Sequence, residues 1–188
     1  SQGWTYDGNA HANPLVTVTE GALLPGDSLV ATATGSVTDV SDTHSGNNPI
    51  AAGYQIMHGA VDVTANYAIT TVAGTLTINP RAVTVTAQDK AFIYTGTAQS
   101  WDKYDVDGLV GADALTAVVE GSITFPSESP VVNEVKSHTF TTGTPGNYTV
   151  SYVNGELTMT NAQAAITITA ASQGWTYDGN AHANPLVT

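Results

Sequence analysis

The stretch at residues 82–87 reads AVTVTA, and the stretch at 165–170 reads AITITA. In both, apolar residues alternate with threonine, so an extended chain has one apolar face and one polar face. The segments GTLTI at 74–78 and GELTM at 155–159 alternate in the same way. This spacing predicts β-strands with one buried face.

Turn-forming residues separate these predicted strands. The step Asn154-Gly155 lies between two alternating segments, which predicts a two-residue β-hairpin, and Ala73-Gly74 is the matching step nearer the N-terminus. No window combines helical spacing of apolar residues with capping residues. We therefore expect an all-β fold of tandem Ig-like β-sandwich modules. A β-grasp-like module is the alternative, and it would need a helix crossing the sheet.

The longest repeat in the chain is an identity. Residues 1–17 and 172–188 both read SQGWTYDGNAHANPLVT, an offset of 172 − 1 = 171 residues. A shorter repeat relates NYAITTVAGTLTI at 66–78 to NYTVSYVNGELTM at 147–159, an offset of 147 − 66 = 81 residues. Such periodicity is typical of proteins built from stacked repeats. We expect the chain to be a segment of a longer array, with neighbouring repeats of the same chain as partners.

The phase of the repeats predicts three parts. Residues 1–80 form a first β module that lacks its first strand, and 81–163 form a complete second module. Residues 164–188 contain the first strand and the opening of a third repeat. A module without one strand exposes unpaired backbone groups, so we expect 164–188 of one molecule to pair head to tail with another. The alternative is that 164–170 completes the sheet of the second module.

Composition restricts the classes of partner. The chain has 4 Lys and Arg against 16 Asp and Glu, a net charge of −12. Binding to nucleic acid requires clustered basic residues, so we expect no nucleic-acid partner. No apolar run reaches the roughly 20 residues that span a bilayer, so we expect no membrane insertion. The chain contains no cysteine, which excludes disulfides and thiolate metal sites.

A family resemblance is carried by Tyr6-Asp7-Gly8, by its copy Tyr177-Asp178-Gly179, and by the ending at Asp62–Pro80. These motifs resemble the YDG/MBG type of bacterial cell-surface repeat. The resemblance implies an extracellular location, at the cell wall or cell surface, in adhesin-like arrays. It weakens in the second module, where Tyr94-Thr95-Gly96 lacks the Asp.

No catalytic constellation is evident. None of the serines lies in a G-x-S-x-G motif, and none of the five histidines forms a recognisable motif with a nucleophile. We expect no enzyme and no cofactor, and instead a structural stalk or spacer. The alternative function is an adhesin module that binds a host glycan or protein through its loops or a sheet edge.

Two groups of side chains remain as candidate sites. Asp102, Asp105 and Asp107 lie within six residues and could supply oxygen ligands for calcium, although a solvated acidic turn is the simpler interpretation. Trp101 has no counterpart in the first module, and we predict that it is exposed and available for binding. Trp4 and Tyr6 lie two apart on one face of a predicted strand, where we expect core packing.

Overall fold

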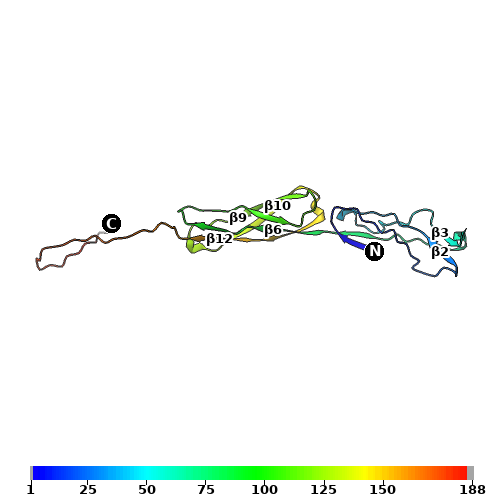
Figure 1. Cartoon of the computed structure of the whole chain (residues 1–188), viewed down its shortest axis with the longest axis horizontal. Helices are drawn as coiled ribbons and strands as arrows, with labels where there is room; N and C mark the ends of the chain where they lie inside the picture. Colours follow the sequence, from blue (N-terminus) through cyan, green and yellow to red (C-terminus); the bar gives the residue numbers. More distant parts are fainter. Residues whose placement is uncertain (1, 186–188) are drawn as a thin grey trace.

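A computed structural model describes residues 2–185, and within them the chain forms twelve β-strands and four 3-10 helices of three residues each. The predicted all-β, sandwich-like fold is confirmed. Figure 1 shows the parts arranged one after another along one long axis. We call residues 2–80 the N-terminal region, 81–160 the central region and 161–185 the C-terminal segment.

The central region consists of two packed sheets. One sheet has the order β11-β6-β8, and the other has the order β7-β12-β10-β9. The strands are β6 (Arg81–Ala87), β7 (Lys90–Ile93), β8 (Tyr104–Asp107), β9 (Ala114–Glu120), β10 (Val131–Thr142), β11 (Tyr148–Val153) and β12 (Gly155–Thr160). Strand β6 is the middle strand of its sheet, pairing parallel with β11 and antiparallel with β8.

The alternation in β6 decides what lies between the two sheets. Val83 and Val85 are fully buried, at 0% exposure, whereas Thr84 and Thr86 face the other side of the sheet and are only partly covered. Leu115 and Val135 of the opposing sheet join the same buried cluster. The core of the central region is therefore built around the strand that the sequence pattern singled out.

The N-terminal region has shorter strands. They are β1 (Gln2–Thr5), β2 (Asp27–Val30), β3 (Gln55–His58), β4 (Val61–Asp62) and β5 (Leu76–Asn79). Strands β1 and β5 pair in parallel, and β2, β3 and β4 form a separate antiparallel sheet. Within the described residues, every strand pair lies inside one region, and none joins the N-terminal region to the central region.

The two regions nevertheless contain the same contacts at matching positions. The Tyr67 hydroxyl accepts a hydrogen bond from the Leu24 backbone N–H and donates one to Asp27. The Tyr148 hydroxyl accepts from the Val110 N–H and donates to Asp113. We call each of these arrangements a tyrosine corner. The sequence offsets are 148 − 67 = 81 for the tyrosines and 113 − 27 = 86 for the aspartates, close to the repeat length in the sequence.

The short helices η1 (Val40–Asp42) and η3 (Pro126–Glu128) match in the same way. At the first, one oxygen of Asp42 accepts two backbone N–H groups, from Thr38 and Asp39. At the second, Glu128 accepts the N–H groups of Thr124 and Phe125. The isolated bridge His11↔Val37 likewise corresponds to Gln99↔Ile123.

The prediction of a hairpin at Asn154-Gly155 is wrong. Strands β11 and β12 flank this step but belong to different sheets, so the chain crosses from one sheet to the other. Gly155 is required by space, because a Cβ there would lie 2.6 Å from the Ala87 carbonyl oxygen. The Asn154 side chain accepts the Val135 backbone N–H instead of forming a turn. The Asn-Gly step is therefore part of the connection between the two sheets and not a tight turn.

The C-terminal segment lies apart from both regions. It extends from the end of the central region that is remote from the N-terminal region (Figure 1). Residues 164–170 belong to neither sheet of the central region, contrary to the alternative in which they complete it. Ile166 and Ile168 are 83% and 73% exposed. The alternating strand pattern is present there, but its apolar face is in water.

Candidate functional site: the junction of the N-terminal and central regions

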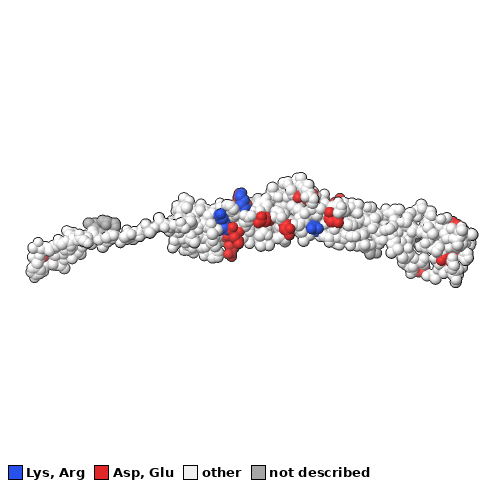
Figure 2. Space-filling model, viewed as in Figure 1, with Lys and Arg blue, Asp and Glu red and all other residues white. Residues whose placement is uncertain are grey.

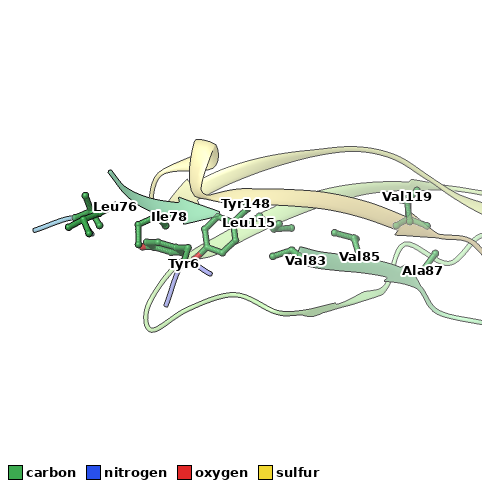
Figure 3. Close-up of a cluster of buried hydrophobic side chains, with 11 residues drawn as sticks. Tyr6, Leu76, Ile78, Val83, Val85, Ala87, Leu115, Val119 and Tyr148 are labelled. Atoms are coloured by element: carbon green, nitrogen blue, oxygen red, sulfur yellow. The ribbon is translucent and has the colours of Figure 1, made fainter. Parts of the chain in front are cut away.

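The N-terminal and central regions share one buried cluster. It contains Ile78 of β5 and Val83 of β6, which lie on either side of Pro80. It also includes Tyr6, next to β1, and Tyr148 at the start of β11. Figure 3 shows the side chains of this cluster extending in a row from Leu76 and Ile78 to Val119 and Ala87. The connection between the regions is therefore packed rather than a free linker.

Two aromatic rings meet across this junction. Tyr6 and Tyr148 contact each other edge to face, with ring centroids 5.4 Å apart. Both are buried, at 8% exposure. Burial and the hydrogen bond to Asp113 raise the pKa of the Tyr148 hydroxyl to about 12. The hydroxyl therefore stays protonated and continues to donate to Asp113, which fixes the ring in place against Tyr6.

Asn147 supplies the polar contacts of the junction. It ends the short helix η4 (Pro145–Asn147) and is 1% exposed. Its side-chain oxygen accepts the Val40 backbone N–H at 2.9 Å, and its nitrogen donates to the Asp39 carboxylate at 2.6 Å. A buried amide with both functions satisfied gives directional contacts, whereas apolar packing alone permits sliding.

The hydrogen bonds of Asn147 and the tyrosine contact act on the same joint. The chain passes through it once, from β5 to β6, and side chains far apart in the sequence close around it. Rotation of one region about Pro80 would break the Asn147 hydrogen bonds and expose the aromatic pair. The arrangement can thus hold two β regions in a fixed orientation, which is a mechanical rather than a chemical capability.

Trp101, the predicted exposed aromatic, is partly buried. It packs beside a second cluster formed by Ile123, Leu157 and Met159. The Lys90 ammonium lies 4.4 Å from its ring centroid, a cation–π contact. An open hollow next to it is lined by Ser100, Trp101, Asp102, Val119, Glu120, Gly121, Ser122 and Lys136. Part of the Trp101 side chain therefore packs against other residues of the protein, and part of it faces the open hollow.

The structure does not bring the three candidate calcium ligands together. Asp102 pairs with Lys103 at 2.9 Å, which lowers the pKa of the Asp102 carboxyl. Asp105 accepts hydrogen bonds from the Gln88 amide. Asp107 lies two residues further along β8 and is exposed. Within residues 2–185, no group of three or more His, Asp or Glu side chains could hold a metal ion.

The histidines lie apart, and their partners are not nucleophiles. His11, His58 and His182 each contact an aspartate, at distances of 2.6–2.9 Å. His138 contacts the Tyr152 hydroxyl, and His44 a backbone carbonyl. None of these contacts involves a serine or threonine hydroxyl. The histidines therefore provide surface and loop contacts within the described residues.

Charge is unevenly distributed along the molecule. All four basic residues, Arg81, Lys90, Lys103 and Lys136, belong to the central region. Figure 2 shows basic side chains among acidic ones over the middle of the molecule. Asp178 is the one charged residue of 161–188. The C-terminal segment thus combines exposed isoleucines with almost no charge.

The sequence did not reveal the residues that form the junction. Asn147 and Asp39 are 108 positions apart, and neither belongs to a repeated motif that marks a joint, because Phe125 stands at the position equivalent to Asp39. The available signal was the Asn-Tyr pair that recurs in the two repeats, Asn66-Tyr67 and Asn147-Tyr148. That pair alone does not locate a joint, because it recurs in both repeats.

The fold and the junction define this protein first as an all-β, sandwich-like protein. The comparison with known families is more specific. Residues 83–158 match the family described as the MBG domain (YGX type), so the central region is an MBG domain. No curated protein and no solved structure matches the chain. Within residues 2–185, no helix has the length and apolar character needed to cross a membrane.

Proposed function

We propose that this chain is part of the stalk of a bacterial cell-surface protein, in which tandem β modules hold a distal part away from the cell. The observation that carries the proposal is the packed junction. A row of buried side chains runs through it, and Asn147 fixes the orientation of the two regions. A stalk needs joints of this kind, because a string of freely jointed modules would collapse on itself.

Three further observations support the proposal. The central region is an MBG domain, a structural repeat family typically found in surface proteins. The two tyrosine corners recur at the repeat spacing. The strong negative charge and the absence of basic residues outside the central region disfavour self-adhesion of neighbouring stalks.

Small-angle X-ray scattering on the monomeric chain tests the stalk function. We expect an elongated particle whose maximum dimension agrees with the two regions held end to end as in Figure 1. The matched variants are Asn147→Ala at the junction and Asn66→Ala at the equivalent, exposed position. The first should broaden the distribution of distances and the second should not. A compact particle, or one equally flexible in all three proteins, would contradict the proposal.

The alternative function is an adhesin that binds a host glycan or protein. The hollow beside Trp101 is the observation that favours it, because an aromatic ring with nearby carboxylates is a common arrangement in ligand sites. A glycan array probed with the full chain separates the functions. Binding that is lost in Trp101→Ala would favour the adhesin, whereas an elongated particle without binding favours the stalk.

A further inference from the structure

Strand β9 lies at the free edge of its sheet. It pairs with β10 on one side, and within the described structure no backbone hydrogen bond joins it to another segment on the other side. Val119 of β9 lies opposite Val135, whose N–H points away from β9 and donates to the Asn154 side chain. In an antiparallel ladder both residues of such a pair turn their backbone groups away from each other. The N–H and C=O groups of Val119 therefore face outward, and alternation along the strand directs those of Ala117 the same way.

Two adjoining hollows lie along this edge. The hollow beside Trp101 shares Asp102 and Val119 with a second one. The second hollow is also lined by Lys103, Tyr104, Ala117 and Val118. The outward backbone groups of β9 thus border a recess that contains aromatic and apolar side chains. Unpaired backbone groups beside apolar side chains form a template for an added strand.

The N-terminal region fills the matching place with its own backbone. The isolated bridges described above align the two regions at offsets of 99 − 11 = 88 and 123 − 37 = 86 residues. Pro14 then corresponds to Asp102, and Ala33 corresponds to Val119. The Ala33 N–H donates to the Pro14 carbonyl at 3.0 Å, whereas no backbone hydrogen bond joins Val119 to Asp102. The same place therefore accepts a polypeptide carbonyl in one region and is open in the other.

A second contact differs at the same place. In the N-terminal region the Gly35 N–H donates to the Asn48 side-chain oxygen at 2.9 Å. The corresponding residues of the central region are Gly121, which lines the hollow, and Asn133, which is 0% exposed. The Asn133 side-chain oxygen has no hydrogen-bond partner within the described structure. Two independent contacts that close the N-terminal copy are thus not made in the central region.

Charge at this edge favours a basic partner. Glu120 lies opposite Glu134 in the ladder of β9 and β10, and Lys136 forms its salt bridge with Glu134. Lys103 is likewise paired with Asp102. Glu120 is exposed and forms no salt bridge within residues 2–185. Since like charges opposite each other destabilise a sheet, a basic side chain beside Glu120 would be favourable.

We propose that the free edge of β9 binds an extended segment of a partner protein that carries a basic residue beside Glu120. The segment adds a strand to the sheet β7-β12-β10-β9, and its backbone groups bond to those of Ala117 and Val119. Alternate side chains of the segment enter the two hollows. This contact goes beyond the stalk function and does not depend on it, because the stalk requires only the junction.

A polypeptide fits this edge better than the other two possible occupants. A saccharide would not use the alternating N–H and C=O groups, whereas the matching place of the N-terminal region already bonds to a backbone carbonyl. A second copy of the chain is disfavoured because each molecule has a net charge of −12. The partner is therefore a different, basic protein.

An NMR titration of the full chain with the peptide KTVTVTK tests the proposal. The peptide has the length of β9, seven residues, with alternating side chains and a lysine at each end. We expect saturable shifts of the backbone amide signals of 117–121 and of the Trp101 indole signal. The control is the same peptide methylated at every backbone nitrogen, which cannot donate to a strand and should not bind. Absence of shifts at 117–121, or equal binding of the methylated peptide, would overturn the proposal.

Charge reversal tests the position of the basic residue. Glu120→Lys should weaken binding of KTVTVTK by about fivefold, the order expected for an exposed ion pair, and should strengthen binding of ETVTVTE. The matched control is Glu156→Lys, at an exposed position of β12, which should change neither affinity. Equal effects in the two variants would contradict the contact with Glu120.

The same spectra distinguish the other occupants. Shifts at 117–121 that cellohexaose produces and neither peptide does would assign the hollows to a glycan and overturn the proposal. Shifts at these residues that depend on protein concentration without peptide would assign the edge to a second copy and overturn it too. Each of these results leaves the stalk function standing, because that function depends on the junction inside one molecule.

Discussion

The central and N-terminal regions contain the same tyrosine corner, the same capping carboxylate and the same bridge, but only the central region has a middle strand. In the central region, where β6 is present, Tyr148–Val153 is a strand. The side chains that pack around it belong to the buried cluster. In the N-terminal region, the matching residues 67–72 have no strand structure. The comparison shows that the corners and caps form from local contacts in both regions, whereas within the described residues a three-stranded sheet of the order β11-β6-β8 is found in the central region alone.

The largest expected difference is in the loss of stability when aspartate is introduced at two matching positions of the repeated strand pattern. Val85→Asp introduces a charge at a residue with 0% exposure and should destabilise the central region by more than about 4 kcal/mol. Ile168→Asp changes the matching residue, which is 73% exposed, and should leave the unfolding of the dilute monomer within about 0.5 kcal/mol of the parent.

Urea denaturation followed by tyrosine and tryptophan fluorescence measures both free energies. Val132→Asp, at another exposed position, controls for the added charge. Similar destabilisation by the substitutions at 85 and 168 would mean that the C-terminal segment is folded into a core of its own monomer. That result would mean that the strand pattern at 165–170 is buried in the monomer, as β6 is in the central region.

A smaller effect is expected at the junction. Asn147→Ala removes the hydrogen bonds to Val40 and Asp39 and leaves their partly buried polar groups unpaired, which should cost about 2 kcal/mol. Asn66→Ala at the equivalent, exposed position should cost almost nothing. Differential scanning calorimetry should also show the two regions unfolding further apart in temperature in the first variant. If the two regions of the Asn147→Ala variant unfolded as close together in temperature as those of the parent, apolar packing alone would hold the joint.

The tyrosine corners allow a direct comparison of the two regions. Tyr148→Phe removes the donor to Asp113 and the acceptor of the Val110 N–H in a buried corner and should cost about 1.5 kcal/mol. Tyr67→Phe removes the same pair of contacts in the more exposed corner and should cost less. Chemical denaturation of each variant measures its loss of unfolding free energy, and the two losses are then compared. Equal losses would indicate that the N-terminal region is as well buried as the central one.

Sequence patterns predicted the strands better than their connections. The alternation in 82–87 identified β6 and its buried valines, because a period of two depends only on which side chains face the core. The Asn154-Gly155 step was misinterpreted, since the conformation there is set by the passage of Gly155 against the Ala87 carbonyl. The candidate site could not be predicted, because Asn147 meets Asp39 only after both regions have folded.

The smallest expected effect concerns the loop that the identical strings share. Asp7 accepts the Asn9 backbone N–H and contacts His11, and Asp178 does the same with Asn180 and His182. The backbone hydrogen bond first, and the histidine second, lower the pKa of Asp7 to about 2 and also lower the pKa of Asp178. The loop thus has the same contacts beside a core and in the exposed C-terminal segment.

The sign of the pH dependence is set by a folded-state pKa that is lower than the unfolded one. The contribution of Asp7 is fully present above the ordinary carboxyl pKa of 3.8 and is lost as the pH falls toward about 2. Carboxyl chemical shifts measured by NMR should show both aspartates titrating below that ordinary value, and Asp7→Asn should remove a small part of the acid sensitivity. If Asp178 titrated normally while Asp7 did not, the loop would depend on the neighbouring core, and the local origin of the repeated contacts would have to be abandoned.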